Sequence, residues 1–196
     1  MPKVVPEYKD EARKRIIEQA LVTFSEKGYY KTRMVDIAEK MGVSKGAIYQ
    51  YFSSKRDLFL AVVQYHTSMR EKVMRRFLQS GSIEVIASGA FFDQMLSVRM
   101  GSFLLTQDLI QELTDDSFKI ELSDMTDNWV SGLRDLIDKY KQEGVVKSDV
   151  DSDAIARGMI ALRDGLYGSI DLGADVEKVK TSWTSVMKAL MKDVLS

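Results

Sequence analysis

The placement of proline is the feature of this 196-residue chain that most restricts its fold. Two prolines are present, Pro2 and Pro6, and none follows through to residue 196. Proline interrupts helices and is common in turns, so a β-rich or loop-rich protein of this length rarely lacks it. Apolar residues also recur at intervals of three and four along most of the chain, the spacing of amphipathic helices. The sequence therefore predicts an all-α fold.

Glycines and polar caps set the predicted helix boundaries. A first helix is expected to end at Gly28, because glycine tolerates the left-handed backbone at a helix C-terminus. A short second helix is predicted over residues 35–41, and Ser44 is expected to cap a third. A long helix follows over residues 55–77. Further helices are predicted over residues 82–100, 102–113, 116–143, 151–172 and 175–195.

Missing residue types limit the chemistry that this chain can perform. Without cysteine there are no disulfides, no Cys-ligated zinc or iron–sulfur clusters and no thiol catalysis. The single histidine, His66, cannot form a His-x-x-x-His zinc site, and any Ser-His-Asp set would have to use it. We therefore expect no metal, no cofactor and no enzymatic activity, and a helical enzyme is kept only as a third option.

Hydropathy indicates the compartment. The longest uninterrupted apolar run covers residues 58–63, far short of the roughly 20 residues that span a bilayer. The amino-terminal residues contain no apolar segment of the kind found in signal peptides. The absence of cysteine fits a reducing cytoplasm. We therefore expect a cytoplasmic protein with no membrane partner.

Charge is distributed unevenly along the chain. Residues 1–76 carry 16 Lys and Arg against 9 Asp and Glu, whereas residues 77–196 carry 12 against 20. A basic amino-terminal part on an acidic remainder favours a polyanionic partner, nucleic acid first. Charge also fluctuates along ordinary chains, so this imbalance alone leaves both interpretations open.

Residues 37–52 have the pattern of a helix-turn-helix. Ala38 is small enough for two helices to cross closely, and Gly42 permits a tight turn. Val43 and Ile48 are expected to fill the angle between the helices, and Phe52 to join the core. The second helix is predicted to expose side chains suited to phosphates and base edges, namely Lys45, Ala47, Tyr49 and Gln50. A helical corner in any α protein is the alternative at this point.

These residues closely resemble the amino-terminal signature of the tetracycline-repressor (TetR) family. The similarity spans roughly residues 12–60 and is carried by the segments 28–32 (GYYKT), 37–38 (IA), 42–52 (GVSKGAIYQYF) and 55–58 (KRDL). A weaker similarity to the family's eighth helix involves Gly144, Asp151, Ala156 and residues 164–166. The resemblance implies a helix-turn-helix DNA-binding domain over residues 1–56. It also implies a helical effector-binding and dimerisation domain over residues 57–196, in which residues 57–78 form a connecting helix.

The resemblance also implies which residues contact DNA: Thr32, Arg33, Ser44, Lys45, Gly46, Ala47, Tyr49, Gln50, Tyr51 and Lys55. Tyr51 and Lys55 are expected at phosphates, and a lysine at a helix amino end binds an anion well. Tyr49 and Tyr51 have half-buried packing as the alternative. Arg33 departs from the family, which has a hydroxyl there, so we expect the capping box to be lost and the cap to move to Thr32.

A ligand cavity in the second domain is likewise implied by the resemblance. Its expected lining is Phe91, Met95, Arg99, Phe103, Trp129, Leu133, Met159 and Arg163. Methionine adapts to varied ligands, and arginine can bind an effector carboxylate. The alternatives are that these apolar residues are ordinary core and that the arginines pair with carboxylates such as Asp164.

The last two predicted helices carry long apolar stripes and the glycines Gly158, Gly165 and Gly168, which allow close helix approach. The predicted dimer interface comprises Leu162, Leu166, Ile170, Trp183, Met187 and Leu190. The expected function is that of a homodimeric repressor that leaves its double-stranded operator DNA when a small apolar or amphipathic effector binds. The alternative is an all-α ligand carrier or adaptor that does not bind DNA.

Overall fold

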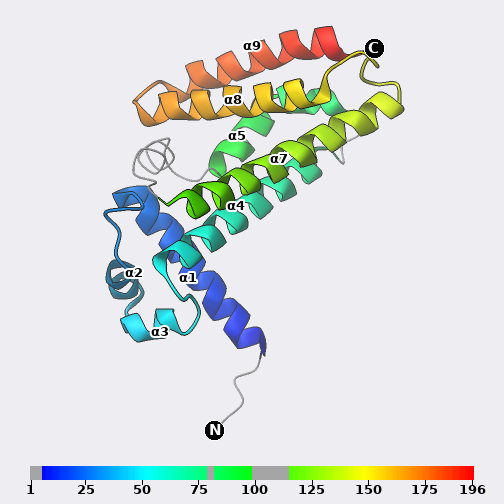
Figure 1. The fold of residues 1–196 in the computed structure, drawn as a ribbon. Coiled ribbons are helices and arrows are strands. Elements are labelled where there is room, and N and C mark those ends of the chain that lie inside the picture. Colours follow the sequence, from blue (N-terminus) through cyan, green and yellow to red (C-terminus); the bar gives the residue numbers. More distant parts are fainter. Residues whose placement is uncertain (1–5, 79–81, 99–114) are drawn as a thin grey trace. The chain divides into compact units, whose positions relative to one another are not determined.

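The computed structural model describes residues 6–78, 82–98 and 115–196, which are almost entirely helical (Figure 1). Contacts within the chain divide the described residues into two compact units, residues 6–68 and residues 69–98 with 115–196. The all-α fold predicted from the sequence is confirmed.

The first unit contains α1 (Pro6–Lys27), α2 (Met34–Met41), α3 (Lys45–Tyr49) and the beginning of α4 (Lys55–Leu78). Its core is aromatic: Phe24 and Phe59 are fully buried, and their ring centroids lie 5.4 Å apart in an edge-to-face arrangement. Ile48 and Phe52 are buried as predicted. This small core holds the two short helices in place.

The second unit contains the rest of α4, a 3₁₀ helix η1 (Ile83–Ala87), α5 (Gly89–Ser97), α7 (Asp116–Gln142), α8 (Ser152–Asp171) and α9 (Val176–Val194). Helix α8 packs against α7 and α9, and α9 also contacts η1 and α5 (Figure 1). Trp183 is buried, and its Nε1 donates to the carbonyl of Ile86 at 3.0 Å. In the described part of the chain, no helix combines the length and the hydropathy needed to cross a membrane.

Most predicted helix boundaries agree with the structure to within one or two residues, and one predicted helix is divided. The segment predicted as a single helix over residues 82–100 forms η1 and then α5. Ser88 separates them, because its extended backbone ends η1 and its Oγ accepts from the N–H of Phe91 at 3.1 Å to cap α5. The helix predicted over residues 102–113 lies outside the described residues.

Candidate nucleic-acid interface

The turn between α2 and α3 depends on one glycine and one serine. Gly42 has φ 66° and ψ 29°, a left-handed conformation that L side chains rarely adopt, and it ends α2. Ser44 Oγ then accepts from the N–H of Ala47 at 3.2 Å and caps α3, as predicted. Val43 was predicted to be core and is instead 41% exposed. Ile37 of α2 and Ile48 of α3 are fully buried instead, and the side chain of Val43 in the turn stays at the surface.

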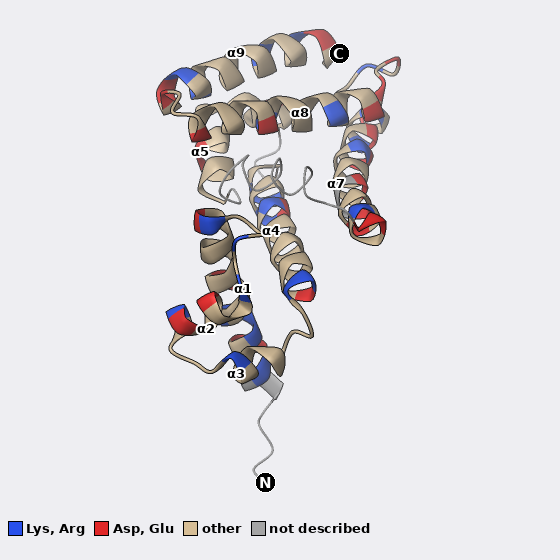
Figure 2. Cartoon of the chain, turned by 60° about the vertical axis from the view of Figure 1, so that its left-hand side comes forward, with Lys and Arg blue, Asp and Glu red and all other residues tan. Residues whose placement is uncertain are grey.

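Helix α3 presents an exposed polar face. Lys45, Gly46, Gln50 and Tyr49 are exposed, the last by 43%, whereas Ile48 faces the core. The Lys45 ammonium lies 5.3 Å from the centroid of the Tyr49 ring, a cation–π distance. The charged residue of α3 is Lys45, whereas α2 carries both acidic and basic residues (Figure 2). This face combines an ammonium, a phenol and an amide, which are groups that bind phosphates and base edges.

Two other residues that were predicted to contact DNA are less exposed to solvent. Ala47 and Tyr51 are partly buried. Tyr51 therefore has the half-buried position that the sequence left as an alternative.

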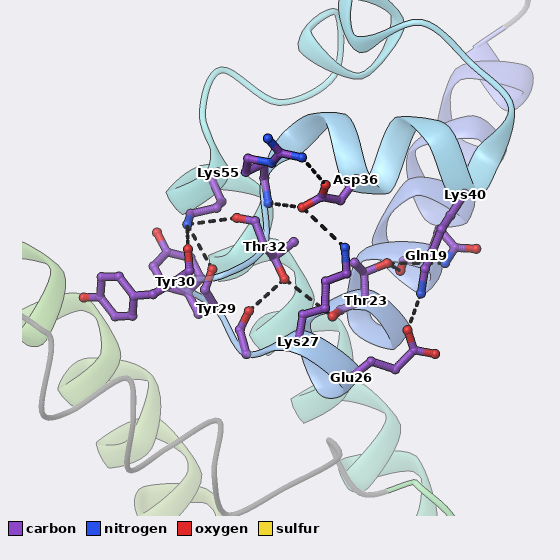
Figure 3. Close-up of polar contacts among 12 residues, drawn as sticks. Gln19, Thr23, Glu26, Lys27, Tyr29, Tyr30, Thr32, Asp36, Lys40 and Lys55 are labelled. Atoms are coloured by element: carbon purple, nitrogen blue, oxygen red, sulfur yellow. Dashed lines mark hydrogen bonds and ion pairs between the residues drawn. The ribbon is translucent and has the colours of Figure 1, made fainter.

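Lys55 has a different role from the phosphate contact predicted for it. Its Nζ donates to the carbonyls of Tyr29 at 2.9 Å, Tyr30 at 3.3 Å and Thr32 at 3.1 Å (Figure 3). It also lies 4.4 Å from the centroid of the Tyr29 ring. An ammonium has three N–H donors, and these three carbonyls engage them. Lys55 therefore fixes the start of α4 to the turn between α1 and α2.

Thr32 was predicted to contact DNA. It is fully buried, so its side chain is not available for that contact. Its hydroxyl donates to the carbonyl of Gly28 at 2.7 Å and stabilises the same turn (Figure 3). The cap of α2 does not move to Thr32 either. The N-cap is Arg33, whose backbone N–H donates to Asp36 Oδ2 at 2.8 Å.

The carboxylate half of the capping box is therefore kept. The exposed Arg33 side chain adds a second bond, from Nη2 to Asp36 Oδ1 at 3.0 Å, and Lys27 Nζ lies 3.7 Å from Asp36 (Figure 3). The hydrogen bonds from Arg33 lower the pKa of Asp36 from its ordinary 3.8 to about 2, and Lys27 adds a smaller attraction. The bonds favour the charged carboxylate, so they stabilise α2 above pH 3.8 and lose that effect as the pH falls towards 2.

An Asp36→Asn variant is accordingly expected to have a lower thermal midpoint than the parent protein at neutral pH. The difference should shrink as the pH falls below 3.8, because the parent carboxylate is then protonated as well. Circular dichroism melts across this range measure it. Glu39→Gln, an exposed position of the same helix, is the control. A difference that stays constant down to pH 2 would show that the charge of Asp36 is irrelevant.

In the second unit, six of the eight predicted ligand residues line one cavity. They are Phe91, Met95, Trp129, Leu133, Met159 and Arg163. Arg99 and Phe103 lie outside the described residues. Arg163 also pairs with Asp164, at 2.7 Å from Nη2, which was the alternative for this arginine. Arg70 was not predicted from the sequence, and its guanidinium carbon lies 4.8 Å from the Trp129 ring centroid.

The predicted dimer residues divide into two groups. Trp183 and Met187 are 4% and 0% exposed within a single chain, so assigning them to a dimer interface was wrong. Both belong to the core of the second unit, because the apolar stripe of α9 packs on η1 and α5. The others are partly buried against the same core: Leu162, Leu166, Ile170 and Leu190.

The outer face of α8 is formed by small residues. Ala154, Gly158, Ala161 and Gly165 are exposed along it, at the spacing of one helix face. A Cβ built on Gly158 or Gly165 would meet nothing within 4 Å. Gly168, which was predicted to act together with these glycines, is buried and does not belong to this face.

Comparison with known proteins agrees with this architecture. Residues 16–62 match the family model described as bacterial regulatory proteins, tetR family. The uncharacterised regulator YfiR of Bacillus subtilis is 40% identical over 63 residues, which span 32% of this chain and only 31% of that protein. The repressor Rv1474c of Mycobacterium tuberculosis is 26% identical over 181 residues, covering 91% of this chain and 92% of that protein.

Solved structures share this fold over most of the chain. A TetR-family regulator from a Rhodococcus species superposes with a TM-score of 0.79 at 21% identity, covering 93% of this chain and 99% of that one. FadR of Bacillus subtilis, solved in complex with stearoyl-CoA, has a TM-score of 0.70 at 18% identity and covers 88% and 95%. The helix-turn-helix geometry and the family match identify residues 16–62 as a domain of the TetR family of transcriptional regulators, and the chain shares the fold of solved TetR-family proteins.

Proposed function

We propose that the protein is a cytoplasmic homodimeric repressor, without catalytic activity, that binds operator DNA through α3 and leaves it when a small amphipathic effector binds. The observation that carries this proposal is the exposed face of α3, where Lys45, Tyr49 and Gln50 project from a helix fixed by Gly42 and Ser44. Binding residues on a rigid support suit specific recognition, because little ordering is needed on binding.

Dimerisation is supported by the outer face of α8. A helix face made of Ala154, Gly158, Ala161 and Gly165 lets another helix approach closely, and nothing in the described chain covers the two glycines. A two-fold dimer presents two copies of α3, as needed for half-sites about 34–36 Å apart on DNA. We assign the interface to this face of α8 and the adjacent face of α9, in place of Trp183 and Met187.

Effector binding is supported by the cavity that contains Phe91, Trp129 and Arg163. Helix α4 supplies Lys55 to the first unit and Arg70 to the second, so this continuous helix connects the cavity to the DNA-binding helices. An effector can alter DNA binding by shifting it. By linkage, operator DNA must weaken effector binding by the same factor as the effector weakens DNA binding.

The DNA interface is tested with fluorescence anisotropy on DNA from upstream of the protein's own gene. Lys45→Ala is expected to weaken binding to all sequences alike and to reduce the salt slope by about one, since it removes a phosphate contact. Gln50→Ala is expected to change base preference at one position by about 1–3 kcal/mol. Lys139→Ala, at an exposed lysine of α7, should change neither.

Unchanged affinity and unchanged base preference in both α3 variants would remove the DNA assignment. A parent protein that binds small amphiphiles but no DNA would instead support the alternative of an all-α ligand carrier.

A further inference from the structure

The polar groups at the cavity of the second unit are mainly hydrogen-bond donors. Apolar and aromatic side chains of α4, α5, α7, α8 and α9 form most of its wall. Among them stand the guanidinium of Arg163 and the indole of Trp129, which donate and do not accept, and the hydroxyl of Tyr167, which can donate. A ligand that satisfies this wall must bring acceptors.

Two guanidinium groups lie beside one indole ring. The guanidinium carbons of Arg70 and Arg163 are 4.8 Å and 5.8 Å from the ring centroid of Trp129. Burial lowers the pKa of Arg70 to about 10, and the positive charge of Arg163 acts in the same direction. With a pKa of about 10, Arg70 is still charged at neutral pH, so its positive charge is held where burial and the neighbouring Arg163 oppose it.

The contacts of Arg163 with its acidic neighbour leave part of its guanidinium available to another anion. Arg163 is 6% exposed, and its Nε and Nη2 both bind Asp164 Oδ1, at 2.8 Å and 2.7 Å. A guanidinium has five N–H donors, of which these contacts use two. Asp164 and Glu71, whose charges also act on Arg70, are both exposed, so water already solvates them.

Trp129 supplies a further donor at the same place. Its Nε1 is buried and has no hydrogen-bond partner among the described residues. Buried N–H groups are nearly always hydrogen-bonded in native proteins, so one left over beside two guanidiniums indicates a missing acceptor.

A second hollow lies next to the first and is wholly apolar. Leu133 and Met159 line both cavities and so form the partition between them. The second is closed by aliphatic side chains: Ile83, Ile86, Leu136, Ile137, Val146, Val150, Ile155, Met191 and Val194. The two cavities measure about 20 Å³ and 10 Å³, room for little more than a water molecule in the first. A larger ligand must therefore displace side chains, and Met74, Met95 and Met159 have the flexibility to move.

We infer that the effector is an unbranched amphiphile with an anionic end, whose head accepts hydrogen bonds from Trp129 Nε1, Arg163 and Arg70 and whose alkyl chain passes Leu133 and Met159 into the second cavity. The regulatory role of this ligand rests on the proposed function, whereas its binding chemistry does not. The head is a carboxylate or a phosphate monoester, since both offer only acceptors when ionised.

Isothermal titration calorimetry on the full chain tests this with four probes below their micelle concentrations. Dodecanoate is expected to bind at least about tenfold more tightly than dodecanol, because the alcohol lacks the charge. Dodecyltrimethylammonium should bind more weakly than dodecanol, because two guanidiniums repel it. Octanoate should bind roughly 250-fold more weakly than dodecanoate, at about fourfold for each of the four methylenes removed. Dodecyl phosphate, added as a further arm, distinguishes a phosphate head from a carboxylate head.

Variants separate the head from the chain. Arg163→Met and Trp129→Phe are expected to weaken dodecanoate about tenfold and about threefold, while dodecanol binding stays unchanged and so shows that the cavity is still folded. Arg134→Met is the matched control, since this arginine of α7 lines neither cavity and should leave both affinities as they are. Met159→Phe, which stiffens the partition, should remove the advantage of dodecanoate over octanoate.

Equal affinity for dodecanoate and dodecanol, or no effect of Arg163→Met, overturns the anionic head. No binding of any probe overturns the site, yet leaves the proposed repressor intact if the protein still binds its operator. Tight dodecanoate binding that leaves operator affinity unchanged keeps the site and removes the effector role from the proposed function.

Discussion

A Lys55→Arg variant is expected to lose operator binding and about 2 kcal/mol of stability in the first unit, although the charge is kept. The ammonium of Lys55 donates to three carbonyls, those of Tyr29, Tyr30 and Thr32. A planar guanidinium presents its donors in a rigid fork and cannot converge on three carbonyls around a single nitrogen. Amide hydrogen exchange should show faster opening of residues 29–34, which lead into α2.

The same substitution distinguishes this role from a phosphate contact. At a phosphate, arginine replaces lysine readily, so retained operator affinity and unchanged exchange in Lys55→Arg would support the role first predicted from the sequence. Lys31→Arg, an exposed lysine of the same turn, is the matched control and should change neither measurement.

A Gly158→Glu variant is expected to be monomeric. The proposed interface would bury one unpaired carboxylate from each copy, which we expect to weaken dimerisation by about 3–5 kcal/mol. The chain itself should not be destabilised, because Gly158 is exposed and nothing lies within 4 Å of an added Cβ. Glutamate also has the higher helix propensity. Sedimentation equilibrium measures the change, and operator affinity should fall with it because one half-site contact is lost.

Gly132→Glu on α7 provides the control for this experiment. Gly132 is also an exposed helical glycine with open space around its Cβ position, so the same substitution there should leave the association state unaltered. A Gly158→Glu protein with the parent's dimer dissociation constant would place the interface elsewhere.

The helix-turn-helix was predictable because its determinants are local. Gly42 sets the backbone of the turn. Ser44 caps α3 through a hydrogen bond from the N–H of Ala47, only three residues further along the chain. The role of Lys55 was not predictable, because its acceptors are 23 to 26 residues earlier in the chain. A lysine at a helix amino end suits both a phosphate and a turn of carbonyls, and only the folded chain distinguishes the two.

Helical periodicity predicts which face of a helix is buried, but it does not identify the partner. The stripe containing Trp183 and Met187 was correctly predicted to be apolar, yet it packs on η1 and α5 of its own chain. The open face of α8 gave no signal because Ala and Gly are not strongly apolar. Arg70 was missed since an arginine on a long helix usually faces solvent, and tertiary packing brings it over Trp129.

Both tryptophans of the chain belong to the second unit, Trp129 beside the cavity and Trp183 in the core. Selective excitation of indole emission therefore observes that unit alone, whereas the described part of the DNA-binding unit contributes only tyrosine and phenylalanine to the ultraviolet spectrum. The two fluorophores also differ in their surroundings. The indole of Trp183 is held by its hydrogen bond to the carbonyl of Ile86, while the Trp129 indole lies beside the guanidinium groups of Arg70 and Arg163. The emission of Trp129 is therefore expected to change when a ligand enters the cavity, whereas that of Trp183 should stay nearly constant. The described part of the first unit adds no indole emission at that wavelength.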